Sequence, residues 1–378
     1  NNPVRYGLMI TNMQTTKMLS TSAFEQWLAN QTATIARYRE VEKSPLLAEY
    51  NTLKKIVESE DFQAKKTQLL TTKYNQTQEG KTMAKYHSMK WNISVILFNL
   101  FHKETWKEKT EVAKYLELVA QIQTPEFQKS NAFWKNPKRW YTTPESQQDN
   151  RYMALSKHAD ICFYNAHTQE EITELESYKL AWNDEFDGTQ MAKHWESGFL
   201  YPSKDFQANH SYTSERQAYT KGQNTHVANS VLSLTTRKQS TTAPAWHPTK
   251  GLMMHPFAFT SDVWHSNIPA ITSKKGVLQI KMACVGKVRH AICLVSPKSQ
   301  NVLSILPSNL MQKNYVVYTL VWNEKETIWY QNNQELKREI KSLPATPLHL
   351  LLRSYLPIDQ VGSTGLLNID WIRVYTKA

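Results

Sequence analysis

The sequence predicts two segregated domains, an all-α region followed by an all-β sandwich, in a chain of 378 residues. Only two of the ten glycines, Gly7 and Gly80, precede residue 176. Because glycine marks turns, its scarcity favours helices in the first half, and its return favours strands in the second. From residue 178 onward, apolar and polar residues alternate over short stretches bounded by turn residues, which is typical of a β-sandwich. We therefore expect a helical domain at 1–175 and a β-sandwich at 176–378.

A Tyr/Leu pattern recurs through the first half. Its copies are YNTL (50–53), YLEL (115–118) and YMAL (152–155), with weaker copies that start at Tyr38 and Tyr86. A tyrosine and a leucine three residues apart lie on one face of a helix. The copies run on to helix-start signals such as Ser59 and Thr124. We expect short helices in series, forming a loose helical array rather than a solenoid of fixed period.

The helical domain has two interpretations. One is a spacer or a docking module for a protein partner, and the other is a structural appendage packed on the sandwich, which we favour. Within it, the segment WKNPKRW (134–140) mixes aromatic and basic residues. Such a segment either contacts a glycan or a phosphate backbone, or forms a loop whose tryptophans fold back on the domain. We favour the loop.

The net charge of +12, from 45 Lys and Arg against 33 Asp and Glu, draws the protein to polyanions. Nucleic acid is one candidate, and a sulfated or uronic polysaccharide is another. The sequence contains no helix-turn-helix, zinc-finger or glycine-rich RNA motif, so we expect no nucleic-acid partner.

The three cysteines, Cys162, Cys284 and Cys293, are too few for a disulfide scaffold. An odd number leaves at least one free thiol. Cys284 and Cys293 either face each other across a hairpin or are two separate buried thiols, and we favour separate thiols.

The chain has no run of 18 apolar residues, so we expect no membrane span. It also has no charged-then-apolar start of the secretory kind, and so no targeting segment in the sequence as given. The start at Asn1 suggests a processed or trimmed chain. We expect the protein to be secreted, periplasmic or held at the cell surface.

The second half resembles glycoside hydrolase family 16, which includes laminarinases, lichenases, agarases and carrageenases. The stretches that carry the resemblance are YKLAWNDEFDG (178–188), NSVLSLTTR (229–237), GVLQIKM (276–282), RHAICLVSP (289–297), YVVYTLVW (315–322), TIWYQNNQEL (327–336) and IDWIRVY (369–375). The resemblance implies a concanavalin A-like jelly roll and a role in carbohydrate metabolism. The Tyr/Leu copies are similar to helical repeats attached to some bacterial members of this family.

The family's catalytic carboxylates are missing. Active members carry E-x-D-x-x-E, in which the first Glu attacks the anomeric carbon and the last protonates the leaving oxygen. The corresponding stretch here is QNVLSIL (300–306), and no Asp or Glu occurs from Val263 to Asn323. Asn301 and Ser304 can donate hydrogen bonds but cannot replace a nucleophile and an acid. We expect no catalytic residue of the usual kind, and whether the chain is an enzyme stays open.

The leading functional hypothesis is therefore a non-catalytic protein that binds a poly- or oligosaccharide on the concave face of a sheet. The candidate glycan-binding residues border the cleft that the resemblance implies, and are Tyr219, Trp246, Trp264, His265, Arg289 and His290. Each has an ordinary structural interpretation as well. Two Trp-His pairs, Trp246-His247 and Trp264-His265, match no metal-ligand spacing, so we expect no metal site and no cofactor.

Two alternatives remain. The first is an active glycosyl hydrolase, of the endo-β-glucanase or galactanase type, whose carboxylates have moved. Glu215 is the candidate, because the resemblance places its segment near the cleft. The second is a protein-interaction scaffold in which the helical domain docks a partner.

Overall fold

A computed structural model confirms the predicted fold class, helices followed by a mainly antiparallel β-sandwich. It describes residues 17–100, 106–200, 210–297, 302–306, 309, 311–344, 347–361 and 364–377. The chain divides into two compact units. The helical unit is Tyr38–His167, and the strand unit comprises the residues up to Arg37 together with Thr168 onward. This division differs from the expected boundary at 175/176.

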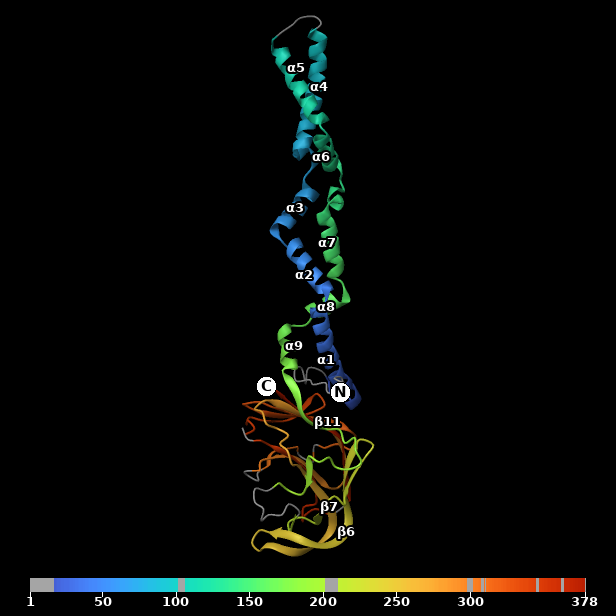
Figure 1. Cartoon of the computed structure of the whole chain (residues 1–378), viewed down its shortest axis with the longest axis vertical. Helices are drawn as coiled ribbons and strands as arrows, with labels where there is room; N and C mark the ends of the chain where they lie inside the picture. The colour runs from blue at the N-terminus through green and yellow to red at the C-terminus, as the bar shows by residue number, and fades with distance from the viewer. Residues whose placement is uncertain are drawn as a thin grey trace. The chain divides into compact units, whose positions relative to one another are not determined.

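The helical unit is built from helices that run out and then return beside one another (Figure 1). The helices of the described chain are α1 (Thr21–Glu42), α2 (Pro45–Val57), α3 (Glu60–Thr71), η2 (Tyr74–Gln76), α4 (Gln78–Leu100), α5 (Trp106–Gln123), α6 (Pro125–Lys135), η3 (Arg139–Thr142), α7 (Pro144–Leu155), α8 (Ala159–Asn165) and α9 (Gln169–Glu176). Helix α2 packs on α7, and α4 packs on α5 and α6. The helices are therefore consecutive in sequence but paired in space.

The Tyr/Leu copies face one another across these helix pairs. Tyr50 stacks on Tyr152 with ring centroids 5.5 Å apart, and Tyr86 stacks on Tyr115 at 5.8 Å. Such aromatic contacts add to the apolar area that each helix buries. The tyrosines that recur along the sequence therefore contact one another, because the chain of helices folds back on itself.

The predicted helix starts at Ser59 and Thr124 are confirmed. Each hydroxyl accepts the backbone N–H three residues on, at 3.3 Å, and so satisfies a donor that the first helical turn leaves unpaired. After the third copy, His158 takes the capping position immediately before α8.

The segment 134–140 folds back on the helical unit. Trp140 is 3% exposed, and the Arg139 guanidinium lies 5.2 Å from the ring centroid of Trp134. Arg139 also donates to the carbonyl oxygen of Thr72. These contacts agree with the structural interpretation of this segment rather than with a free binding surface.

The strand unit contains two layers of strands. The strands are β1 (Tyr178–Asp184), β2 (Trp195–Ser197), β3 (Ser211–Tyr212), β4 (Gln217–Thr220), β5 (Thr225–Ala228), β6 (Val231–His247), β7 (Gly251–Ser266), β8 (Gly276–Gly286), β9 (Arg289–Val295), β10 (Val302–Leu306), β11 (Val316–Trp322), β12 (Thr327–Gln331), β13 (Gln334–Glu339), β14 (His349–Tyr355) and β15 (Gly365–Lys377). One layer, the first sheet, runs β13-β12-β11-β8-β15-β6, with β1 beside β15 and β5 beside β6. The other layer, which we call the cleft sheet, runs β10-β9-β14-β7-β2. The long β6–β7 hairpin joins the two layers (Figure 1).

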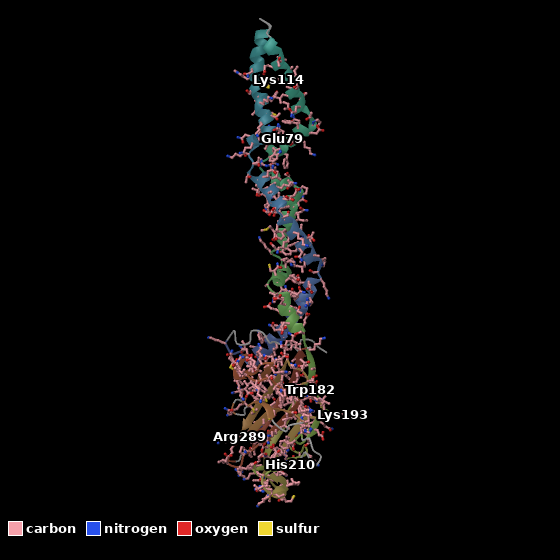
Figure 2. All side chains as sticks on the ribbon, turned by 90° about the vertical axis from the view of Figure 1, so that its left-hand side faces the viewer. Glu79, Lys114, Trp182, Lys193, His210 and Arg289 are labelled. Carbon is pink, nitrogen blue, oxygen red and sulfur yellow. The ribbon has the colours of Figure 1, made fainter. Side chains whose placement is uncertain are left out.

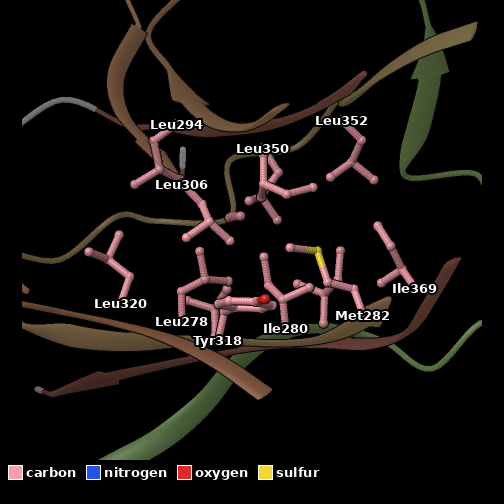
Figure 3. Close-up of a cluster of buried hydrophobic side chains, with 14 of the residues drawn as sticks. Leu278, Ile280, Met282, Leu294, Leu306, Tyr318, Leu320, Leu350, Leu352 and Ile369 are labelled. Atoms are coloured by element: carbon pink, nitrogen blue, oxygen red, sulfur yellow. The ribbon is translucent and has the colours of Figure 1, made fainter. Parts of the chain in front are cut away.

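The core lies between the two layers (Figure 3). Alternate residues of each strand point inward, so Leu278 and Ile280 of β8 meet Leu294 of β9 and Leu352 of β14. All four side chains are at most 1% exposed. This alternation decides which residues of the cleft sheet can face a ligand, because neighbours along a strand lie on opposite faces.

Helices α1 and α9 cover the outer face of the first sheet. Phe24, Leu28 and Leu175 pack there in one cluster with the strand residues Val317, Ile328, Tyr330 and Trp371. The Lys281 ammonium pairs with the carboxylates of Glu25 and Asp370, at 2.9 Å each. The start of α1 and the whole of α9 therefore complete the sandwich, which explains why the strand unit includes helical residues.

The Asn332–Asn333 turn strengthens this attachment. It joins β12 and β13 as predicted, with Asn332 in the left-handed region at φ 49°. The Asn332 amide donates to the Leu19 carbonyl oxygen at 2.8 Å, and the Asn333 side chain accepts the Leu19 N–H at 2.9 Å. One turn thus holds the segment that leads into α1.

The cysteines are all free, in agreement with separate thiols. Burial raises the pKa of Cys284 and of Cys293 to about 12. Both side chains therefore stay protonated near neutral pH, so neither is poised to act as a nucleophile.

Candidate functional site

The outer face of the cleft sheet is covered by aromatic side chains. The outward positions of β7, β9 and β14 include Val263, Ala291, Cys293, Val295 and Leu351. They pack in one cluster with Phe199, Leu200, Tyr212, Tyr219 and Tyr355. Phe199 is 8% exposed and Tyr219 is 5% exposed. This face, where the resemblance implies a glycan cleft, is thus filled by the chain's own residues.

A buried ion pair lies at the centre of this cover. Arg353 of β14 donates to Glu215 at 2.9 Å and to the Tyr219 hydroxyl oxygen at 3.2 Å. Tyr219 and Gln217 donate to the other oxygen of Glu215, at 2.9 and 2.6 Å. The Arg353 guanidinium also stacks 4.1 Å from the ring centroid of Tyr355. Every oxygen of the Glu215 carboxylate is therefore occupied by a donor within the protein.

Among the described residues, no second carboxylate shares the hydrogen-bond partners of Glu215. The cleft sheet carries Glu196 of β2, which is 62% exposed beside His265. It also carries Asp262 of β7, which projects from the opposite face to Val263 because side chains alternate along a strand. The stretch 300–306, where the family's catalytic strand belongs, coincides with β10, but Gln300, Asn301 and the side chain of Ser304 lie outside the described residues.

A second site lies beside Trp264, at the edge of the sandwich where β2 and β7 approach β5. It is a cavity of about 440 Å³, lined by Thr189, Gln190, Met191, Ala192, Lys193, Trp195, Gly222, Thr225, His226, Val227 and Trp264. We call it the Trp264 pocket. The indole N–H donates to the Thr225 hydroxyl oxygen at 2.7 Å, so the polar atom of Trp264 is satisfied inside the protein. The rest of the indole forms an apolar wall among hydrogen-bonding side chains.

Asp262 shapes one wall of this pocket from behind. Its carboxylate accepts the backbone N–H of Asn224 at 2.7 Å and the Thr225 hydroxyl at 2.7 Å, and it also bonds to the Thr220 hydroxyl. Burial raises the pKa of Asp262, although these hydrogen bonds oppose the shift. The hydroxyl of Thr225 therefore links Asp262 to Trp264 and fixes the indole against the 220–225 turn.

Gly222 lets that turn approach the indole. Its φ of 87° lies in the left-handed region, and a Cβ there would sit 3.4 Å from Cζ2 of Trp264. A larger residue at 222 would strain the backbone and press against the pocket wall.

The structure brings together few of the predicted site residues. Tyr219 and His265 lie on the cleft-sheet side, where the His265 ring bonds to the Gly198 carbonyl oxygen at 2.8 Å. Trp264 lies in its own pocket. Trp246 sits near the tip of the β6–β7 hairpin, opposite Leu252.

Arg289 and His290 begin β9 and point to opposite sides. Arg289 is exposed, and Figure 2 shows it and Lys193 at opposite edges of the strand unit. His290 is 3% exposed and bonds to the Ser354 hydroxyl at 2.7 Å, on the same side of the sheet as the core residue Leu352.

The burial of His290 makes stability depend on pH. Desolvation lowers its pKa to about 4, whereas an unfolded histidine titrates near about 6.5. The unfolded chain therefore binds more protons between these values, so stability falls as the pH drops through this window. We expect a loss of up to about 3 kcal/mol in the free energy of unfolding between pH 6.5 and 4. His290→Gln removes this part of the loss, as urea unfolding at several pH values would show.

The control is His87→Gln, because His87 is exposed on α4. It should keep the pH dependence of the parent protein. Parallel stability curves for the parent and His290→Gln would contradict the prediction.

The described residues contain no group of three or more His, Cys, Asp and Glu side chains placed to hold a metal ion. Nor does any helix in the described part of the chain combine the length and apolarity needed to cross a membrane.

Sequence reasoning found Trp264 but missed the other residues of its pocket. Thr225, Gly222 and Lys193 come from a turn and a loop that carry no motif. One available signal was Asp262, the single acidic residue between Glu215 and Glu324. An isolated acid within a long basic stretch is a candidate for a buried structural role, which Asp262 fulfils.

Among solved structures, the chain is similar to the catalytic domain of an endo-1,3-β-glucanase (laminarinase) from Thermotoga petrophila. That match has a TM-score of 0.40 and 16% identity, over 53% of this chain and 98% of that one. An endo-β-1,3-glucanase from Pyrococcus furiosus gives a TM-score of 0.39 and 15% identity, over 53% and 95%. A κ-carrageenase from Pseudoalteromonas carrageenovora, in complex with an oligotetrasaccharide of κ-carrageenan, gives 0.39 and 13%, over 53% and 96%. Similarity at this level does not define what this chain does.

No protein-family model matches the sequence, and no curated protein matches it.

Proposed function

We propose that this protein binds a poly- or oligosaccharide in the Trp264 pocket and does not cleave it. The observation that carries this proposal is the pocket itself. Trp264 presents an apolar indole surface beside Thr189, Gln190 and His226, which can hydrogen-bond to sugar hydroxyls. Its volume of about 440 Å³ lies in the range usual for small-ligand sites.

The arrangement of acidic residues supports binding over hydrolysis. A retaining glycosidase places two carboxyl groups about 5 Å apart. Glu215 is held by Arg353, Tyr219 and Gln217, and no carboxylate is among the described residues that line the Trp264 pocket. The pocket therefore offers contacts for a sugar but no acid and nucleophile.

The test is a panel of polysaccharides assayed for both binding and release of reducing sugar. Binding without release supports the proposal. Release of oligosaccharides that Glu215→Gln abolishes would instead establish a glycosidase with relocated carboxylates. Absence of both would favour the interaction-scaffold hypothesis, with a protein partner on the helical unit. A secreted, periplasmic or cell-surface location belongs to the same proposal, and fractionation of producing cells would test it.

Trp264→Leu is expected to weaken glycan binding about tenfold or more, because leucine keeps apolar volume but loses the flat stacking surface. Isothermal titration with the tightest glycan of the panel measures the change. Trp91→Leu is the matched control, since Trp91 is 76% exposed on α4 in the other unit. Equal affinities for the parent and Trp264→Leu would remove the pocket from the proposal.

A further inference from the structure

The net charge of the chain is concentrated in one segment. Residues 216–323 contain twelve Lys and Arg but one acidic residue, Asp262. Eleven of the twelve net positive charges therefore belong to this segment, which runs from β4 through β11. The helical unit carries 20 Lys and Arg against 15 Asp and Glu, a net +5, which the net −7 of residues 168–215 offsets.

The single negative charge of this segment is not on its surface. Asp262 is fully buried, and its carboxylate is taken up by the hydroxyl and N–H groups of the 220–225 turn. By contrast, Lys221 and Arg237 are exposed. The exposed cations can pair directly with a ligand from solvent, whereas Asp262 presents no carboxylate oxygen at the surface.

One cation lines the Trp264 pocket, and two more belong to or bond with the 220–225 turn that forms one of its walls. Lys193 lines the cavity itself. Lys221 immediately precedes Gly222 in the turn that forms one wall, and Arg237 of β6 donates to the Gln223 carbonyl oxygen of that turn at 2.6 Å. Within the part of the chain that the structure describes, none of these three forms an ion pair.

Two acidic side chains that precede the pocket-lining loop in sequence, Asp184 and Asp187, are engaged in hydrogen bonds. Asp184 bonds to the rings of His194 and Trp195 at 3.0 and 2.8 Å, and Asp187 accepts the Ser230 hydroxyl at 2.8 Å. A negative group that enters the cavity would therefore meet Lys193 without displacing a carboxylate.

We propose that the Trp264 pocket selects acidic sugars, those that carry a carboxylate or a sulfate ester, over neutral ones. This inference rests on the proposed function and adds the class of ligand to it. The sugar ring lies against the indole of Trp264, and its anionic group pairs with Lys193 and with Arg237. A carboxylate and a sulfate ester would pair with these cations in the same way, and the probes below distinguish the two groups.

The test measures binding of the full chain to four polysaccharide probes, polygalacturonate, dextran sulfate, dextran and laminarin, and to random-sequence DNA, at low and high salt. We expect the two acidic polymers to bind about tenfold or more tighter than the neutral ones at low salt, and to lose that advantage as salt rises. Stronger binding of polygalacturonate or of dextran sulfate then identifies the carboxylate or the sulfate as the preferred group.

The variants locate the effect. Lys193→Gln and Arg237→Gln should each weaken binding of the acidic polymers about three- to tenfold and leave neutral binding unchanged. Lys287→Gln is the matched control, an exposed cation of the same segment that does not line the pocket, and should change neither. Circular dichroism confirms that each variant is folded.

Several outcomes overturn this inference. Equal binding of acidic and neutral polymers, both lost in Trp264→Leu, would refute charge selection while the proposed function stands. An equal loss in Lys287→Gln would show diffuse attraction rather than a site. Tighter binding of random-sequence DNA than of any polysaccharide would replace the ligand class. Absence of binding to all four polymers would refute the proposed function as well.

Discussion

Phe24→Ala is expected to lower the free energy of unfolding of the strand unit by about 3–5 kcal/mol. Phe24 is 0% exposed and packs with Leu28 and Leu175 on the outer face of the first sheet. The change leaves a cavity over Trp371 that rigid strands cannot close. Chemical denaturation followed by tryptophan fluorescence would measure the loss.

Ile340→Ala provides the comparison, because Ile340 is 87% exposed and its truncation should change stability by no more than about 0.5 kcal/mol. Similar small effects for both variants would mean that α1 is not part of the strand unit.

The same reasoning predicts that a chain cut at 176 exposes the apolar surface of β11, β12 and β15 and aggregates.

Arg353→Leu is expected to destabilise the protein by about 3–5 kcal/mol, because it leaves the Glu215 carboxylate buried without its cation. Glu215 is 7% exposed and cannot turn to water while Tyr219 and Gln217 hold it. The measurement is again the free energy of unfolding.

A double variant separates the charge from the packing. Replacing Glu215 and Arg353 together by leucine removes both charges and should recover a large part of the stability, so the two single effects do not add. Arg338→Leu is the control, since Arg338 pairs with Glu335 at 2.7 Å in a partly exposed position and its replacement should change stability far less than Arg353→Leu does. A similar cost for Arg338→Leu and Arg353→Leu would refute a special role for the buried pair.

The strands of the sandwich could be predicted because alternation and turn residues are local signals. GVLQIKM (276–282) and YVVYTLVW (315–322) coincide with β8 and β11 within a few residues. The attachment of α1 could not be predicted in this way. The spacing of Phe24 and Leu28 is that of any amphipathic helix, so it does not show which surface they contact. That surface is formed by strands of the first sheet, which are distant in sequence.

The site was less predictable than the fold, since the face that a strand residue occupies depends on its register with neighbouring strands. Arg289 and His290 are adjacent in sequence, yet one is exposed and the other is buried beside Ser354. The covering of the cleft sheet depends on residues such as Phe199, which lie in irregular segments without a periodic signal. Residue type alone was enough to select Trp264. Its partners Thr225 and Asp262 could be recognised only once the fold had brought them beside it.

The stacked tyrosines of the helical unit set an order for its assembly. Tyr86 and Tyr115 close a short loop, Tyr50 and Tyr152 a much longer one, and Tyr38 and Tyr164, whose ring centroids are 4.5 Å apart, the longest. The entropy lost on closing a loop grows with its length, and each inner contact shortens the loop left for the next. We therefore expect the pairing of α4 with α5 to form before the Tyr50–Tyr152 contact, and the Tyr38–Tyr164 contact to form last.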